Sequence, residues 1–186
     1  MTTATAASSV LRLSHDVFSD VERTSDVRVG GDGNSGEASS SFADLSLKKH
    51  VLDGLTASGF SRPSPVQWEA IPKAALGVDL IVQSKAGTGK TLVYVAAAMH
   101  VVDVEKEGGG VQVLVMAPTR EIAVQGSRAV IDVSRPAMPE LRVASFIGGI
   151  SLAEDEAKLK AKKKCPHVAV GTPGRYAAFH RGAQER

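Results

Sequence analysis

The feature of this sequence that most constrains its fold is an alternation of short apolar runs with longer segments of helical periodicity after residue 42. The short runs are rich in Val, Leu, Ile and Ala, which is typical of strands buried on both faces of a sheet. Strands that alternate with helices predict parallel βαβ units, and therefore an α/β fold around an open parallel sheet. We expect strands within 79–84, 111–118, 142–149 and 167–174, and helices within 45–59, 64–76, 91–106, 120–134 and 151–164.

Local signals indicate where the first two helices end and begin. Gly59 follows the first apolar-periodic segment and is a good C-terminal cap, because glycine adopts the left-handed conformation without strain. Ser64 and Pro65 open the second segment, where serine is a preferred N-cap and proline suits the first helical turn.

Residues 1–41 differ in composition from the rest and contain the run "GGDGNSGEASSS". Such a segment cannot bury enough apolar surface to offset the entropy lost on ordering. We therefore expect a disordered N-terminal tail over 1–41 and one folded unit over 42–186.

Composition excludes several classes of protein. The net charge of +2 does not by itself indicate nucleic-acid binding. Cys165 is the only cysteine, so no internal disulfide is possible and an intracellular, reducing compartment, nuclear or cytoplasmic, is expected. The five histidines show no metal-ligand spacing with Cys165, which predicts no structural zinc. No apolar run reaches the roughly 18 residues of a membrane span.

The segment "SKAGTGKT" at 84–91 follows an expected strand and opens an expected helix. Gly87 and Gly89 allow the backbone to curl so that several N–H groups point at phosphate oxygens. Lys90 can reach the β- and γ-phosphates, and the Thr91 hydroxyl can bind Mg²⁺. The general phosphate-loop pattern has a glycine where this chain has Ser84, which is also small. The alternative is a glycine-rich turn that contains "GKT" by chance.

Every expected strand ends in a cluster of small or polar residues. These clusters are "SKAGTGKT", "APTRE", "IGG" and "GTPGR". Ligands of open α/β sheets bind at the carboxyl ends of the strands, which lie along one edge. The four clusters should therefore form one surface.

The motifs and their order resemble those of the DEAD-box RNA helicases of superfamily 2. "GFSRPSPVQ" at 59–67 precedes the phosphate loop, and "APTREIAVQ" at 117–125, "GG" at 148–149 and "TPGR" at 172–175 follow it. The resemblance implies a RecA-like P-loop NTPase fold in which 42–186 is a partial first domain, truncated before the Asp-Glu-Ala-Asp motif. It also implies ATP and Mg²⁺ as cofactors and RNA as the partner. The whole protein would couple ATP hydrolysis to local remodelling of RNA duplexes or RNA–protein complexes.

The resemblance also assigns residues to the nucleotide. Gln67 would pair with adenine, because an amide both donates and accepts. Phe42 and Arg62, with Phe60, would stack on or wall the base, although both phenylalanines also suit a hydrophobic core. Lys90 and Thr91 would be catalytic, with Thr91 as the metal ligand. The phosphate contacts would come from Ser84, Lys85, Ala86, Gly87, Thr88, Gly89, Lys90 and Thr91.

By the same resemblance, the later motifs grip the RNA sugar-phosphate backbone without reading bases. Arg120 and Arg175 would bind phosphate oxygens, although Arg120 could instead pair with Glu121. The implied RNA-binding residues are Pro118, Thr119, Arg120, Gly148, Gly149, Thr172, Pro173 and Arg175. The lysine-rich run at 158–164 is better interpreted as a solvated helix face, since acidic residues precede it.

Within the family, "FIGG" and "CPHVAVGTPGR" are most similar to the branch found in the survival-of-motor-neuron complex, which implies RNP-assembly proteins as partners. The 186 residues contain no Asp-Glu-Ala-Asp segment, so we expect this chain alone to bind nucleotide weakly and not to hydrolyse it. Two alternatives remain open. One is a non-hydrolysing nucleotide- and RNA-binding module, and the other is a different P-loop enzyme such as a small-molecule kinase.

Overall fold

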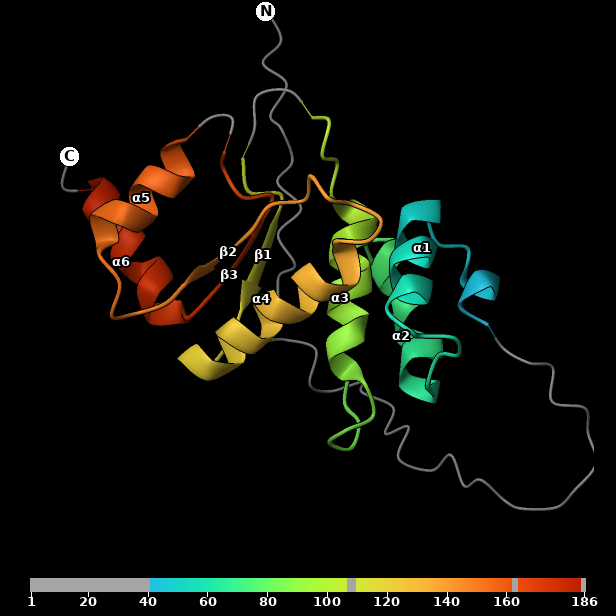
Figure 1. Ribbon diagram of the computed structural model, residues 1–186. Coiled ribbons are helices and arrows are strands. Elements are labelled where there is room, and N and C mark those ends of the chain that lie inside the picture. The colour runs from blue at the N-terminus through green and yellow to red at the C-terminus, as the bar shows by residue number, and fades with distance from the viewer. Residues whose placement is uncertain (1–40, 107–109, 162–163, 185–186) are drawn as a thin grey trace, which may run out of the picture.

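The computed structural model describes residues 41–106, 110–161 and 164–184, arranged as helices around a small parallel sheet (Figure 1). The sheet consists of β1 (Val113–Met116), β2 (Val143–Phe146) and β3 (Val168–Gly171) in the order β1-β3-β2. Val113 and Val143 both lie in register with Val168, in parallel pairing. All four residues of the central strand β3 are buried. The predicted α/β fold with a parallel sheet is therefore confirmed, and the expected tail over 1–40 lies outside the described residues.

The helices form two groups on either side of the sheet region in Figure 1. Helix α4 contacts β2 and β3, and α1, α2 and α3 continue from it as a packed layer. Helices α5 and α6 contact each other on the other side. The elements are η1 (Phe42–Leu45), α1 (Lys49–Ala57), α2 (Pro65–Ala75), α3 (Lys90–Val101), α4 (Arg120–Ser134), α5 (Leu152–Lys160) and α6 (Pro173–Gln184). None of these described helices is both long and apolar enough to cross a membrane.

The predicted helix signals of the first two helices are confirmed. Ser64 is the N-cap of α2 and accepts a hydrogen bond from the Gln67 backbone, while the Gln67 side chain accepts from the Ser64 backbone. This reciprocal capping box satisfies two N–H groups that a helix start leaves without partners. Pro65 is the first residue of α2, and Gly59, just after α1, has a φ of 83°.

Helix α3 ends earlier than the sequence predicted. The expected helix ran to residue 106, but the backbone becomes extended at Val102, with a ψ of 133°. Asp103 then bonds in both directions to the Gln112 side chain, receiving at its carbonyl and donating from its N–H. This link fastens the end of α3 to the approach of β1, so the chain leaves the helix there.

The expected strand over 79–84 is not formed, and that prediction was wrong. None of its residues belongs to a strand, although burial alternates, with Leu80 and Val82 against the core and Ile81 43% exposed. A parallel strand exists only through hydrogen bonds to a neighbour, and within the described residues β1 and β2 each pair only with β3. The apolar run therefore correctly predicted a segment that contacts the core, but it could not show whether a neighbouring strand would pair with that segment.

Two elements were not predicted at all, η1 and α6. Helix α6 begins at Pro173, directly after β3, and brings Tyr176 and Phe179 against Phe146 of β2. The ring centroids of Phe146 and Phe179 lie 5.7 Å apart in an edge-to-face arrangement. Proline at the first helical position and two aromatic residues three apart were the available signals.

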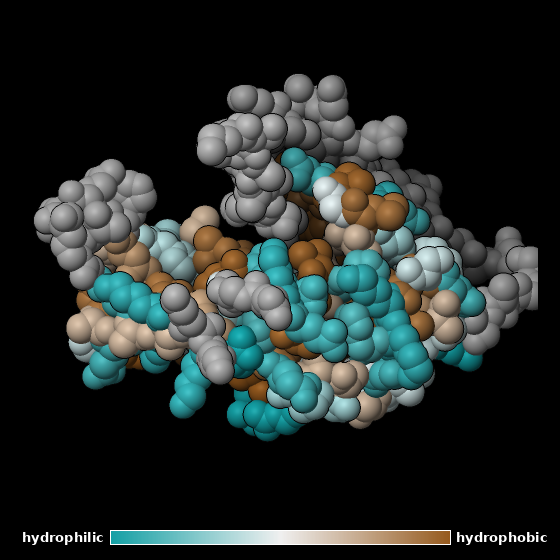
Figure 2. Space-filling view, turned by 90° about the horizontal axis from the view of Figure 1, so that it is seen from above, coloured by the Kyte–Doolittle hydropathy of each residue, from teal (hydrophilic) through white to brown (hydrophobic). Residues whose placement is uncertain are grey.

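The hydrophobic core extends through the α1–α4 layer and between this layer and the sheet. Val51, Leu55, Ile71, Met99 and Val130 are fully buried in it. Gly54 allows the close approach of α1 and α4, since a Cβ there would lie 2.6 Å from the Val133 carbonyl oxygen. Apolar side chains also reach the surface in separate places, as the brown areas of Figure 2 show.

Candidate nucleotide and RNA sites

The phosphate loop is wrapped around the ammonium group of Lys90. Lys90 Nζ donates to the carbonyl oxygens of Ser84 at 2.6 Å and Lys85 at 2.7 Å, with the Ser84 hydroxyl at 3.3 Å. Gly87 and Gly89 both have left-handed backbones, with φ of 79° and 89°. Helix α3 begins at Lys90, so its N-terminal end faces the loop. The loop thus presents a cation and a helix start at one place, as a phosphate requires.

Ser84, the departure from the general loop pattern, takes part in this arrangement. Its hydroxyl lies 2.6 Å from the Thr88 hydroxyl, and Thr88 in turn donates to the Lys85 carbonyl at 2.9 Å. The side chain is half-buried. Thr91 lies exposed in the first turn of α3, and its side chain is hydrogen-bonded to that of Tyr94 on the same helix.

Gln67 links α2 to the phosphate loop. Its Nε2 donates to the Gly89 carbonyl at 3.1 Å and its Oε1 accepts from the Ser64 N–H at 2.8 Å. The Ser64 hydroxyl donates to the Thr88 carbonyl at 2.8 Å. A side-chain amide has two N–H groups and two lone pairs, so these bonds occupy one donor and one acceptor position of Gln67. The residue is only 7% exposed, and its recognition of adenine stays a prediction. Gly89 has no room for a Cβ beside the Gln67 amide.

The other residues predicted to contact the base differ in accessibility. Phe42 is 3% exposed and belongs to the hydrophobic core, so its ring offers no free face to a base in this arrangement. Phe60 is 38% exposed and Arg62 is exposed, so both are available. The core interpretation therefore fits Phe42, and the base-contact prediction stays open for Phe60 and Arg62.

Three of the four clusters that were predicted to form one surface converge on one hollow, and no residue of the phosphate loop lines it. The segments after β1, β2 and β3 are more than 20 residues apart in sequence yet line the same depression. An adjoining groove shares Arg120, Glu121 and Gly148 with it. Of the predicted RNA-binding residues, the hollow is lined by Pro118, Thr119, Arg120, Gly148, Thr172 and Arg175.

Arg120 lies against the paired glycines of this hollow. A Cβ at Gly148 would be 2.8 Å from Arg120 Nη2, and one at Gly149 would be 3.3 Å from Nη1. Within the described residues Arg120 forms no ion pair, so the predicted alternative of a salt bridge with Glu121 is not formed. The Glu121 carboxylate receives hydrogen bonds from its own backbone N–H and from Thr119, and these, together with the nearby Arg120 charge, lower its pKa. Arg120 therefore interacts with Glu121 at a distance but forms no ion pair with it.

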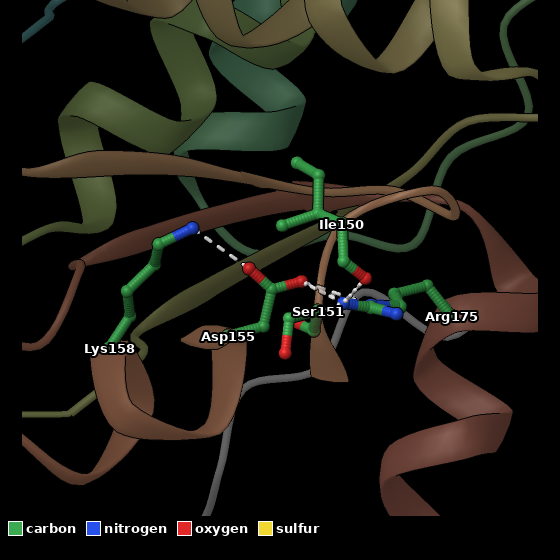
Figure 3. A network of polar contacts seen from close by, with 5 residues as sticks. All are labelled: Ile150, Ser151, Asp155, Lys158 and Arg175. Carbon is green, nitrogen blue, oxygen red and sulfur yellow. Dashed lines mark hydrogen bonds and ion pairs between the residues drawn. The ribbon is translucent and has the colours of Figure 1, made fainter. Parts of the chain in front are cut away.

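Arg175 behaves differently, because its guanidinium is engaged within the protein (Figure 3). Its Nε and Nη2 donate to Asp155 Oδ2 at 2.9 and 2.7 Å, and Nη2 also donates to the carbonyls of Ile150 and Ser151 at 2.8 Å. Lys158 Nζ contacts the other oxygen of Asp155 at 2.8 Å. Whether Arg175 also reaches an RNA phosphate stays a prediction.

Sequence reasoning missed Asp155. It lies in the run Glu154, Asp155, Glu156, which served only as a reason to interpret the following lysines as a solvated face, yet its side chain is fully buried. For Lys158 and Lys160 the solvated-face interpretation fits, since each is largely exposed and pairs with an acid on its own helix. Helical spacing was the missed signal, because Leu152, Asp155 and Leu159 fall on one face of α5.

Comparison with known proteins gives consistent matches. A family model described as DEAD/DEAH box helicase matches residues 64–186. The human ATP-dependent RNA helicase DDX39A is 47% identical over 143 residues, which are 77% of this chain and 32% of that protein. The solved structure of S. cerevisiae Dbp5 bound to RNA and ADP BeF3 is similar with a TM-score of 0.64 and 28% identity, over 77% of this chain and 34% of that one. A DEAD box protein from the hyperthermophile Methanococcus jannaschii gives a TM-score of 0.64 and 26% identity, over 76% and 37%.

These matches confirm the predicted RecA-like fold and the resemblance stated from the motifs. The closer likeness to the branch of the survival-of-motor-neuron complex is not supported by them. This chain spans about a third of the length of the relatives it matches. Since the family model covers two thirds of the chain and every motif from Ser64 onward, the chain belongs to the DEAD/DEAH box helicase family.

Proposed function

We propose that this chain provides the ATP-binding and RNA-backbone-binding part of a DEAD-box RNA helicase, which uses ATP hydrolysis to remodel RNA duplexes or RNA–protein complexes. The observation that carries the proposal is the convergence of three strand-end segments beside Arg120, a cation without an ion-pair partner in the described part of the chain. Side-chain hydroxyls, glycine backbone and a free guanidinium are the groups that bind a sugar-phosphate backbone. The similar solved structure of Dbp5 is bound to RNA, which supports RNA as the class of ligand.

For the nucleotide, the residues present fit a triphosphate. Lys90 holds loop oxygens that phosphate oxygens would replace, and the loop already has its glycines in left-handed conformations. Thr91 would hold Mg²⁺, whose charge helps to neutralise the phosphates. Gln67 would recognise adenine with the donor and acceptor positions that its internal bonds leave free. Because Gln67 is hydrogen-bonded to Gly89, binding of the base would be coupled directly to the conformation of the phosphate loop.

The RNA proposal is tested by the salt dependence of binding. Affinity of the chain for two unrelated single-stranded RNAs would be measured between 50 and 200 mM salt, for the parent chain and Arg120→Ala. Loss of one phosphate contact should weaken the binding of both RNAs about equally. It should also reduce the slope of the logarithm of the binding constant against the logarithm of the salt concentration by roughly 0.7.

Arg128→Ala is the matched control, because Arg128 lies on the same helix and is already paired with Asp132. It should leave affinity and slope nearly unchanged. A loss confined to one RNA sequence, or an equal loss in both variants, would contradict the assignment of Arg120.

A further inference from the structure

The strongest unassigned feature is the buried carboxylate of Asp155 behind the RNA-facing hollow. Asp155 is fully buried and the Arg175 side chain is 9% exposed. Burying two charges is costly unless each finds several partners, and here Asp155 receives bonds from Arg175 and Lys158. Such a pair holds its elements in one arrangement, so the question is which elements it holds.

Arg175 connects α6 to the turn that follows β2. While its Nε and Nη2 bind Asp155, Nη2 also donates to the carbonyls of Ile150 and Ser151. These two residues directly follow the paired glycines Gly148 and Gly149, against which Arg120 packs. Figure 3 shows Asp155 between Lys158 and Arg175, with the Ile150 carbonyl pointing at the guanidinium. A chain of contacts therefore runs from Asp155 through Arg175 to the glycine turn.

We propose that Asp155 is a positioning residue for RNA binding: it fixes Arg175, and Arg175 fixes the Gly148–Ser151 turn against Arg120. This inference rests on the proposed RNA-binding function and assigns Arg175 a supporting role in place of a direct phosphate contact. A guanidinium suits the role, because its planar fork can donate to a carboxylate and to two carbonyls together, which an ammonium cannot do in the same geometry.

The proposal predicts an effect opposite in sign to simple electrostatics. Removing a negative charge near a phosphate-binding surface should strengthen RNA binding by reducing repulsion. If Asp155 acts by positioning, Asp155→Asn should instead weaken RNA binding, by roughly tenfold, the ratio that corresponds to 1.4 kcal/mol. Asparagine has nearly the same shape, so the change tests charge and bonding and leaves packing volume unaltered.

The experiment compares the parent chain with Asp155→Asn, Arg175→Lys and Lys158→Met, each first checked for folding by circular dichroism. Hydrogen exchange of peptides covering 147–155 reports the order of the turn, and single-stranded RNA and a fluorescent ATP analogue report the two binding sites. Asp155→Asn and Arg175→Lys should both speed hydrogen exchange in peptides covering 147–155 and lower the affinity for RNA. The affinity for the ATP analogue should be unchanged. Lys158→Met removes the most exposed partner, leaves the Arg175 pair intact, and should change little.

Any other result of these measurements would count against the proposal. Unchanged or tighter RNA binding by folded Asp155→Asn, or full RNA affinity in Arg175→Lys, overturns the positioning role, since lysine retains a charge able to contact phosphate. If Asp155→Asn does not fold, Arg175→Lys alone gives the answer. If the parent chain binds no RNA, the proposed function fails, and unchanged exchange at 147–155 in the variants would independently refute the structural part.

Discussion

Replacement of Gln67 by alanine should weaken the binding of ATP more than that of GTP, and it should also lower the stability of the fold. The side chain makes two internal hydrogen bonds, to the Ser64 N–H and the Gly89 carbonyl. At about 1 kcal/mol net for each bond, Gln67→Ala should lose about 2 kcal/mol of unfolding free energy. For a domain of this size the melting temperature should fall by roughly 6 °C. Loss of the adenine contact should cost a further ~1–3 kcal/mol of ATP binding alone.

Ser64→Ala separates the two roles of this segment. It removes the bond to the Thr88 carbonyl and the helix cap, but it leaves the Gln67 amide in place. The loop should loosen and both nucleotides should bind more weakly by a similar factor. Affinities would be measured with fluorescent ATP and GTP analogues, alongside thermal melts. Equal binding of ATP and GTP by the parent chain, or equal losses in Gln67→Ala, would refute adenine recognition by Gln67.

Two further outcomes follow from the geometry. Gly148→Ala should weaken RNA binding several-fold with little loss of stability, because the new methyl group displaces only the flexible end of the Arg120 side chain. Gly174 lines the same hollow and has open space around the position of a Cβ, so the Gly174→Ala variant should bind RNA normally. Burial, and after it the nearby Arg142 charge, lowers the pKa of His167. A protonated ring could not accept the hydrogen bond that its Nδ1 receives from the Arg142 backbone N–H. The unfolded state therefore binds a proton at His167 more readily than the folded state does, below the ordinary histidine pKa of 6.5. The free energy of unfolding should fall as the pH drops from 7.5 to 5, and thermal melts of His167→Gln should show a smaller fall.

The parts of the fold that the sequence predicted correctly depend on local rules. Ser64 and Pro65 mark a helix start whatever surrounds them, and Gly59 marks a helix end. The convergence of Thr119, Gly148 and Thr172 was also predictable, because parallel strands place their carboxyl ends along one edge. Neither inference needs knowledge of which side chains touch.

The failures concern partners that lie far away in the chain. The run 79–84 has the composition of a buried strand, but strand formation depends on a neighbour that composition does not identify. Asp155 lies between two glutamates, and only packing against Arg175, 20 positions later, distinguishes it from them. Phe42 suited a base or a core equally well, and its burial at 3% exposure is a property of tertiary packing.

The same distinction ranks the three cations that the motifs assigned to phosphate. Arg120 has no ion-pair partner within the described residues, so binding a phosphate would not break an ion pair. Lys90 holds neutral oxygens of its own loop, and exchanging each bond costs about 1 kcal/mol, which a charged phosphate readily offsets. Arg175 would have to leave a buried carboxylate, and breaking such a pair costs about 3–5 kcal/mol. A motif identifies a cation of the right type, but the bonds it already makes determine whether a ligand can recruit it. We therefore predict that an RNA phosphate would bind Arg120 most readily, that a bound nucleotide would replace the loop oxygens around Lys90, and that Arg175 would stay bound to Asp155.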